Sequence, residues 1–515
     1  MRLTIPRALV ALLVCAMAAP ASAAAPKPPA EGEGAVLITV HPDAIEAVPG
    51  NANPHLVPNL RLERVDGQKP KRVSIPPRLT GLQGSRAYGA ALPPGRYRIK
   101  TLCEACTHYP QLDPGEVPEF EVMPGRTSYL GSLMVATHDR ENPKEGWYRL
   151  HGWEPSPSQA LGDRLLGALF PELTAFGPVD TGAWRPQVGE AEASLAIRKR
   201  IQSLARGLYE PTPAGAKGFF FGGNVGTARR WTPERGFERF DLGVPYQVRT
   251  VLELGEGRLI AGGEAGTLRL SSDDGQSWVD APGELPFGLV VQIMPLDDGE
   301  VVVSILGEEA VSLYRGRPGQ GDWRLLGRHA LAFSIWTGTF GTYPEMSRRG
   351  NTLAVSLPSK AGAVHDLATG QSHAFGLPGS VGNLSLDADG VLRCHCRKRV
   401  ALGLWESRDE GRSWTESELT WQVKAPIVRE TGPVYSVQGP LARRKKPGIY
   451  ASEDGGQTWK RQGDLPPIGW YREHKMTADG SGWLVLGTRA EGFVFFESMV
   501  LSEDGGITWR ELMAP

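Results

Sequence analysis

The stretch SSDDGQSW at residues 271–278 recurs as SRDEGRSW at 407–414, SEDGGQTW at 452–459 and SEDGGITW at 502–509. Ser and Asp side chains bond to nearby backbone amides in tight turns, Gly adopts positive φ without steric cost, and Trp supplies a large apolar surface. The pattern therefore predicts four similar hairpins, and its recurrence indicates a repeat architecture. The residues predicted to build these hairpins are Asp273, Gly275, Trp278, Asp409, Gly411, Trp414, Asp454, Gly456, Trp459, Asp504, Gly506 and Trp509.

The four copies closely resemble the Asp-box motif, which in its family joins the third and fourth strands of a propeller blade. The resemblance implies a fold element rather than a catalytic or calcium site. The step from Trp414 to Trp459 is 45 residues, and segments 317–323 and 366–370 look like decayed copies at similar steps. A further match between 221–227 and 261–267 adds a blade upstream. The sequence thus predicts a mostly β protein with a seven-bladed propeller over residues 213–515.

Two segments precede the predicted propeller. Residues 35–136 alternate short apolar runs with Gly and Pro, which is typical of a β-sandwich. Within them, residues 92–99 (LPPGRYRI) resemble the turn and strand of transthyretin-like accessory domains. Residues 137–212 contain two stretches of helical periodicity, one after Ser158 and one over 190–208, and we interpret them as a brace between domains. A basic amphipathic helix that binds a membrane or a partner is the less favoured alternative.

The first residues predict export. Arg2 and Arg7 precede an apolar run that ends before Ala-Ser-Ala at 21–23, so we expect a signal peptide over 1–23 and a flexible leader over 24–34. The expected location is periplasmic or secreted, and no later stretch is apolar enough for a membrane span. In an oxidising compartment Cys103 and Cys106 could form a disulfide, whereas the state of Cys394 and Cys396 is left open. No metal site is predicted.

Charge is balanced overall, with 56 Lys and Arg against 57 Asp and Glu, so nucleic acid is not an expected partner and recognition must be local. The turns between the second and third strands of every blade should open on one face, opposite the Asp-box hairpins. The first three turns contain Asn224, Glu264, and the pair Glu308 and Glu309. The last four are basic, with Lys360, Arg397, Lys398, Arg399, Arg443, Arg444, Lys445, Lys446 and Arg489. We interpret this half of the face as a binding surface for an anionic protein or glycan, and simply solvated turns are the alternative.

Asp-box propellers include sialidases, so an enzyme has to be considered. Sialidases carry an Arg-Ile-Pro tripeptide that this chain lacks, and neither their arginine triad nor their Tyr/Glu pair can be matched to a motif here. We assign no catalytic residue and no cofactor. The Gly-Gly blades resemble non-enzymatic propellers related to photosystem assembly and stability factors, which implies a protein-binding scaffold. The predicted function is an exported, non-catalytic binding or assembly module. The alternatives are a sialidase-like glycoside hydrolase and a purely structural surface protein.

Overall fold

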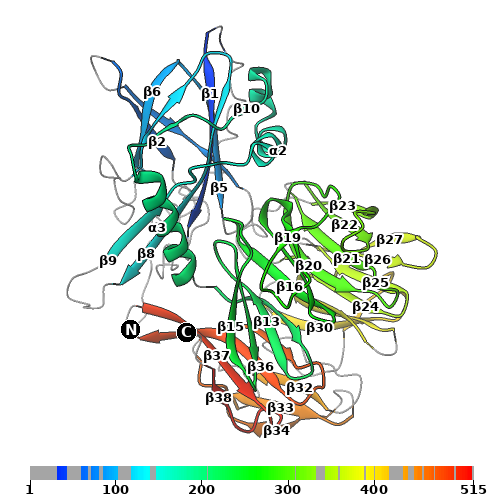
Figure 1. The fold of residues 1–515 in the computed structure, drawn as a ribbon. Coiled ribbons are helices and arrows are strands. Elements are labelled where there is room, and N and C mark those ends of the chain that lie inside the picture. The colour runs from blue at the N-terminus through cyan, green and yellow to red at the C-terminus, as the bar shows by residue number, and fades with distance from the viewer. Residues whose placement is uncertain are drawn as a thin grey trace, which may run out of the picture.

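A computed structural model shows a mostly β chain in which two N-terminal sheets precede a β-propeller (Figure 1). The structure describes residues 30, 32–42, 59–67, 71–79, 85–101, 117–139, 147–205, 207–307, 309–331, 343–357, 360–387, 390–398, 401–416, 433–438, 446–454, 458–468, 470–491 and 494–512. The predicted signal peptide, most of the leader and the Cys103–Cys106 pair lie outside these residues. In the described part no helix is long and apolar enough to cross a membrane.

The N-terminal part contains two sheets that share one hydrophobic core. The first contains β1 (Gly34–Pro42), β4 (Pro77–Leu79), β5 (Arg86–Leu92), β8 (Thr127–Asp139), β9 (Trp147–Gly152) and β10 (Val179–Asp180). The second contains β2 (Leu60–Arg64), β3 (Lys71–Ile75), β6 (Gly95–Thr101), β7 (Glu119–Val122) and β11 (Trp184–Arg185). Alternate residues of both sheets, such as Ile38, Leu62 and Phe120, meet in the core and are at most 1% exposed. The two sheets therefore pack on a common core.

Both predicted helices are present, together with three strands that the sequence analysis did not anticipate. Helix α2 (Gln159–Leu169) begins where Ser158 accepts a hydrogen bond from the Leu161 amide at 3.4 Å, and helix α3 spans Glu190–Leu204. A 3₁₀ segment, η2 (Pro171–Phe176), follows α2. The three unanticipated strands of segment 137–212, β9, β10 and β11, join the N-terminal sheets.

The described residues that follow form seven small antiparallel sheets, and we number them blades 1 to 7 in chain order. Blade 1 contains β12 (Tyr209–Ala214), β13 (Gly218–Gly222), β14 (Thr227–Thr232) and β15 (Gly236–Asp241). Blade 2 contains β16 (Val248–Gly255), β17 (Arg258–Gly263), β18 (Leu268–Ser271) and β19 (Val279–Asp280). Blade 3 contains β20 (Leu289–Pro295), β21 (Val301–Leu306), β22 (Ala310–Gly316) and β23 (Arg324–Ala330). A short 3₁₀ segment, η3 (Glu264–Gly266), lies between β17 and β18.

Blades 4 to 7 continue the same strand order. Blade 4 contains β24 (Met346–Arg349), β25 (Thr352–Ser356), β26 (Ala361–Asp366) and β27 (Ser372–Gly376), and blade 5 contains β28 (Ser380–Leu386), β29 (Leu392–Lys398), β30 (Ala401–Ser407) and β31 (Thr415–Glu416). Blade 6 contains β32 (Val434–Gln438), β33 (Gly448–Ser452) and β34 (Lys460–Gly463). Blade 7 contains β35 (Trp470–Met476), β36 (Trp483–Glu491), β37 (Val494–Ser502) and β38 (Arg510–Glu511). Blade 6 has three described strands, which match the second to fourth positions because its Asp-box segment lies between β33 and β34.

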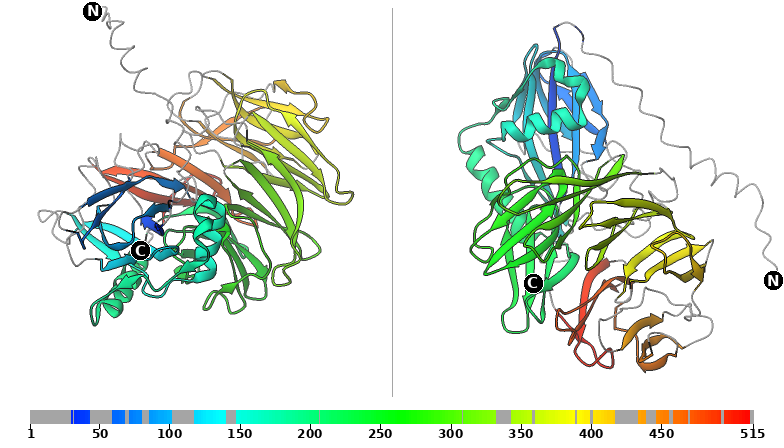
Figure 2. Two further views of the ribbon diagram at one scale, coloured as in Figure 1. Left: turned by 90° about the horizontal axis from the view of Figure 1, so that it is seen from above. Right: turned by 90° about the vertical axis from the view of Figure 1, so that its right-hand side faces the viewer.

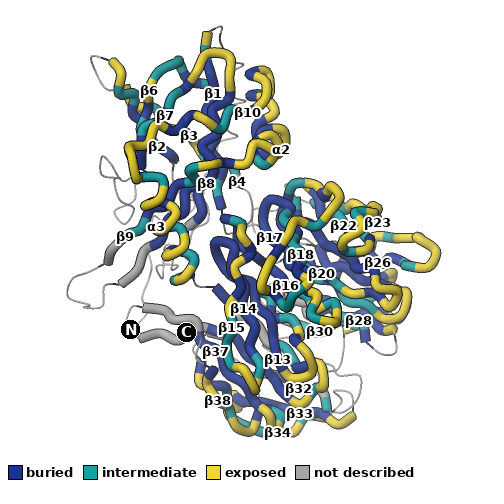
Figure 3. The backbone as a smooth tube through the Cα atoms, viewed as in Figure 1, coloured by how far each residue is buried: buried dark blue, intermediate teal, exposed yellow. Residues whose placement is uncertain are grey.

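Blades pack against their neighbours through apolar side chains on their second and third strands. Blade 1 shares clusters with both blade 2 and blade 7, so the last blade of the chain lies beside the first. In the second of these clusters Phe219 and Phe221 of β13 contact Leu484 and Leu486 of β36. Figure 3 shows the resulting buried strands in dark blue, with exposed turns at both ends. Among the described residues no strand of blade 7 pairs with a strand of blade 1. Side-chain packing and a hydrogen bond from the Asp479 amide to the Ala216 carbonyl at 3.1 Å hold the two ends of the ring together.

The four Asp-box segments form hairpins between the third and fourth strands of blades 2, 5, 6 and 7. In blade 5, Asp409 accepts hydrogen bonds from the Ser413 amide at 2.8 Å and the Ser413 hydroxyl at 2.6 Å, while the Ser407 oxygen accepts from the Gly411 amide at 2.7 Å. Gly411 has φ 88°, which favours glycine, and Trp414 packs on Phe375 of the preceding blade. These aspartates hold the hairpin together, and Gly456 lies outside the described residues.

We expect acid to weaken these hairpins. The Ser413 hydroxyl, the Ser413 amide and the Ser407 hydroxyl lower the pKa of Asp409 from its ordinary value of 3.8 to about 2. A lowered pKa stabilises the folded state above the ordinary value, and this contribution is lost as the pH falls through about 2. Asp409→Asn should therefore lower the melting temperature at neutral pH and flatten its fall between pH 4 and 2. Glu453→Gln, at an exposed carboxylate of the blade 6 hairpin, is the control. Parallel curves for wild type and Asp409→Asn would contradict the prediction.

Candidate binding face

The turns between second and third strands all lie on one face of the propeller, which we call the turn face. The connections between blades share this face, because the strands of each blade run alternately up and down. The turns described in blades 1 to 4 fall where the sequence analysis placed them, and the Asp-box hairpins occupy the opposite face. In blades 5 and 7, however, Arg397, Lys398 and Arg489 belong to strands β29 and β36 rather than to turns. The N-terminal part docks on the turn face, on the side of blades 1 and 2 (Figures 1 and 2).

A buried carboxylate anchors this docking. Glu264, in the second-to-third-strand turn of blade 2, is 0% exposed and contacts Ser85 at the start of β5. The Ser85 amide and hydroxyl donate to the two carboxylate oxygens at 2.8 and 2.5 Å, and the Gln247 amide donates at 3.1 Å. Burial raises the pKa of Glu264, against the opposing effect of these hydrogen bonds. The carboxylate is therefore shared between the two parts of the chain.

His41 of β1 extends this network. Its Nδ1 lies 2.5 Å from Ser85 Oγ, and its ring meets Tyr246 edge-on with 4.8 Å between centroids. Its Nε2 lies 2.9 Å from Thr39 Oγ1, so the ring contacts two hydroxyl groups. Burial, and secondarily the charge of Arg198, hold the pKa of His41 well below its ordinary value. Although serine, histidine and carboxylate meet here, each of the three is at most 2% exposed, so they form an interface rather than an active site.

Both helices strengthen the same contact. Arg164 of α2 donates to the Leu285 carbonyl at 3.0 Å, in the connection between blades 2 and 3. Ile201 of α3 packs in a buried cluster with Val225, in the second-to-third-strand turn of blade 1. The neighbouring Asn224 is 6% exposed and accepts from the Tyr209 hydroxyl at 2.8 Å. The neutral and acidic turns of blades 1 and 2 thus contribute to an internal interface and not to a free surface.

An arginine is held at the turn-face end of the propeller axis. Arg249, near the start of the innermost strand of blade 2, forms an ion pair with Glu210 at 3.2 Å, and both side chains are largely buried. Its guanidinium lies 4.0 Å from the ring centroid of Tyr343 and 5.6 Å from that of Tyr209. This cluster joins blades 1 and 2 to the residues that lead into blade 4. The sequence analysis did not identify it, because its members are far apart in the chain.

The basic turns belong to the other side of the turn face. Lys360 in blade 4 and Lys446 in blade 6 are exposed. The backbones of Arg397, Lys398 and Arg489 lie near the turn-face ends of β29 and β36, and nothing is described of their side chains. The remaining predicted residues, Arg399, Arg443, Arg444 and Lys445, lie outside the described residues. Seen from above (Figure 2, left), the yellow strands of blades 4 and 5 lie beside the N-terminal part rather than beneath it.

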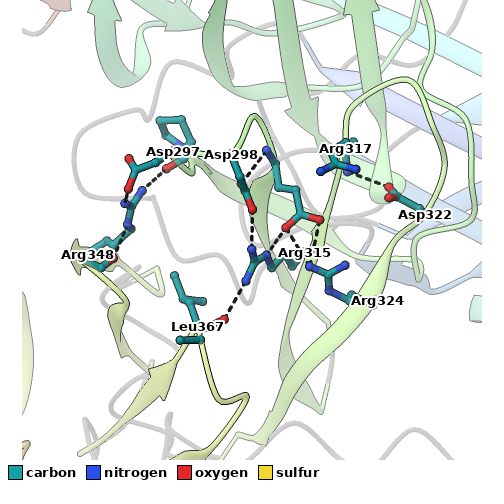
Figure 4. Close-up of polar contacts among 12 residues, drawn as sticks. Asp297, Asp298, Arg315, Arg317, Asp322, Arg324, Arg348 and Leu367 are labelled. Carbon is teal, nitrogen blue, oxygen red and sulfur yellow. Dashed lines mark hydrogen bonds and ion pairs between the residues drawn. The ribbon is translucent and has the colours of Figure 1, made fainter.

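The opposite face carries a network of paired charges between blades 3 and 4 (Figure 4). Glu300 is buried and accepts hydrogen bonds from Arg315 and from Arg324, the latter at 2.8 and 2.9 Å. Arg315 also donates to Asp298 at 2.8 Å and to the Leu367 carbonyl of blade 4 at 2.9 Å. The charged groups of this network pair with one another, and the contact between Arg315 and Leu367 links blade 3 to blade 4.

The cysteines of β29 are paired. Cys394 and Cys396 lie on one face of this strand, and the structure joins them as a disulfide in the core between blades 4 and 5. Among the described residues, no group of three or more His, Cys, Asp and Glu side chains could hold a metal ion.

Comparisons with known proteins give structural likenesses alone. No family profile and no curated protein sequence matches the chain. Among solved structures, YCF48 bound to D1 peptide matches with 15% identity and a TM-score of 0.41, over 60% of this chain and 92% of that one. YCF48 from Cyanidioschyzon merolae matches with 15% identity and a TM-score of 0.42, over 56% and 95%. An ulvan lyase, described as a new family of polysaccharide lyase, matches with 12% identity and a TM-score of 0.40, over 59% and 96%. Because the identities and TM-scores are this low, these matches assign no ligand and no partner to this chain.

Proposed function

We propose that this chain is an exported, non-catalytic binding or assembly module that recognises an anionic partner, a protein or a glycan, through the basic side of its turn face. The proposal rests on one observation, that one side of the turn face is covered and the other side is exposed. The N-terminal part covers turns of blades 1 and 2 and buries Glu264, whereas Lys360 and Lys446 remain exposed on blades 4 and 6. With Glu264 buried in the docked interface, the free side of the face carries the exposed Lys360 and Lys446, next to a single described acidic turn residue, the exposed Glu309 of blade 3.

The nature of the turns favours a broad electrostatic surface over a narrow pocket. Lysine is a strongly hydrated point charge on a flexible stem, which suits partners with many dispersed negative charges. A protein of formal net charge −1 attracts such a partner only where cations are concentrated. Binding of this kind should be fast, and it should weaken steeply with salt because exposed charges are screened within about 10 Å at 0.1 M.

The test is charge reversal on the two faces. We expect Lys360→Glu/Lys446→Glu to weaken binding of heparin, a sulfated glycan, or of poly-glutamate by about tenfold, which corresponds to about 1.4 kcal/mol, and to reduce the salt dependence of the dissociation constant. Lys217→Glu/Arg412→Glu is the matched control, because both side chains are exposed at turns on the opposite face and the net charge changes equally. Isothermal titration at several salt concentrations measures both effects.

The two probes separate the two classes of partner. Stronger loss for heparin would assign a glycan, and stronger loss for poly-glutamate would assign an acidic protein segment. Equal loss in the reversal variant and its control would show that only net charge matters, and the proposed surface would then be wrong. Turnover of a sialoside by the purified chain would instead support the sialidase-like alternative.

A further inference from the structure

Two histidines face each other across the junction of blades 3 and 4. His329 lies on β23, the outermost strand of blade 3, and His365 lies on β26 of blade 4. Their Nε2 atoms are 2.9 Å apart, and the rings meet edge to face at 76° with 5.1 Å between centroids. His365 is 2% exposed, whereas His329 is half-buried at the rim of the propeller. Two nitrogens from different blades thus converge at a point that solvent can reach.

A glycine in β23 leaves room for the two histidine rings to meet. Gly327 lies two residues before His329 and therefore on the same face of β23. A Cβ atom at this glycine would lie 2.5 Å from His365 Cε1 and 3.2 Å from His329 Nε2. The pairing of β22 with β23 also shifts register beside Gly327, between Leu313 and Tyr314. Any larger residue at this position would push the His365 ring away from its partner.

Burial favours the neutral form of both imidazoles. Burial, and secondarily the neighbouring His329 and His373, lower the pKa of His365 to about 4, and burial also lowers the pKa of His329. A neutral imidazole carries one hydrogen, so one Nε2 donates to the other in the metal-free protein. When that hydrogen moves to Nδ1 of the same ring, both Nε2 atoms carry a lone pair and can act as metal ligands. This change of tautomer releases no proton.

The spacing of these nitrogens fits a particular coordination geometry. With metal–nitrogen bonds of about 2.05 Å, nitrogens 2.9 Å apart subtend about 90° at the metal. A tetrahedral angle would instead need about 3.3 Å at the same bond length. Adjacent ligands at 90° are those of square-planar or tetragonal sites, which Cu(II) and Ni(II) prefer, and Cu(II) binds nitrogen ligands most tightly among the divalent first-row ions.

We propose that His329 and His365 form a two-nitrogen site for a tetragonal divalent transition-metal ion, Cu(II) above all, with water in the remaining positions. Among the described residues no third side chain completes a larger ligand group. Water would have to reach the ion from the side of His329, which is half-buried, because His365 is 2% exposed. Because the two ligands come from different blades, a bound ion would also link blades 3 and 4. The proposal is independent of the binding face described above.

The experiment is a titration of the purified full chain with Cu(II), followed by electron paramagnetic resonance and by thermal melting. We expect a tetragonal spectrum with two nitrogen ligands at sub-stoichiometric copper, and a higher melting temperature with copper. His329→Gln should lower the copper affinity by at least about tenfold, since loss of even an outer-shell partner costs 10- to 100-fold, and should remove one nitrogen from the spectrum. Zn(II) should bind more weakly than Cu(II).

Two further variants decide the assignment. His365→Gln should have the same effect as His329→Gln, and if its metal-free melting temperature shows that it does not fold, the half-exposed His329 alone carries the test. His373→Gln is the control, because the Nε2 of His373 lies 2.9 Å from the Glu410 carbonyl and pairs with it. An unchanged spectrum and affinity in His329→Gln would place the copper elsewhere on the chain and overturn the proposal. Loss of the signal in His373→Gln would overturn the two-histidine composition.

Discussion

Glu264→Ala is expected to detach the N-terminal part of the chain from blade 2. The substitution leaves the Ser85 amide, the Ser85 hydroxyl and the Gln247 amide without their acceptor in a fully buried position. A buried donor that loses its partner costs about 1–3 kcal/mol. Since three donors are affected, we expect the docked arrangement to lose about 3–5 kcal/mol, enough to separate parts that a typical interdomain interface holds only weakly.

The measurement has to distinguish undocking from unfolding. Small-angle X-ray scattering should show a larger radius of gyration for Glu264→Ala at 25 °C, while circular dichroism should show unchanged β content. Calorimetry should show the N-terminal part and the propeller melting further apart in temperature. Glu264→Gln should be intermediate, because one oxygen remains as an acceptor while the new amide group faces other donors. Glu256→Ala is the control, an exposed glutamate in blade 2 on the opposite face. An unchanged radius of gyration in Glu264→Ala would contradict the assigned role.

The blade pattern could be predicted from the sequence because its signals are local. An Asp-box hairpin is specified within eight residues, and its position fixes the third and fourth strands of a blade. The turn at Gly262–Gly266 and its counterpart in blade 1 likewise fix the second and third strands. Helix α2 likewise begins directly after Ser158, where the sequence analysis placed the start of the helical periodicity. The two-residue strands β10 and β11 could not be predicted, because their only signal is the sheet edge that they meet.

The functional consequences depend on contacts between distant residues, and these could not be predicted. Glu264 was placed correctly in a turn, but its partner Ser85 lies 179 residues earlier in the chain. The pair formed by His329 and His365 comes from separate blades with no shared motif. On the basic side of the turn face, the sequence predicts turns rich in Lys and Arg. The structure adds that Lys360 and Lys446 are exposed. The common action of all nine basic residues stays a prediction, because most of those side chains are not described.

The second large effect is expected from Glu300→Ala, in the connection between β20 and β21 on the face opposite the docked N-terminal part. The side chain of Glu300 is 5% exposed and pairs with Arg315 and Arg324. Removing one partner of a buried ion pair costs about 3–5 kcal/mol, because the remaining charge stays buried without compensation. We expect about 3 kcal/mol here, since Asp298 still pairs with Arg315 and Arg324 is already 54% exposed. Urea denaturation measures this loss.

Two arginine variants test whether the tie between blades, rather than charge alone, explains the effect. Arg315 is 16% exposed and reaches the Leu367 carbonyl of blade 4, whereas Arg324 pairs with Glu300 within blade 3. Arg315→Ala should therefore destabilise the propeller nearly as much as Glu300→Ala, and Arg324→Ala should cost less than about 1 kcal/mol. Equal effects of the two arginine variants would mean that Glu300 is stabilised by the general positive potential. The contact to Leu367 would then contribute nothing to holding blades 3 and 4 together.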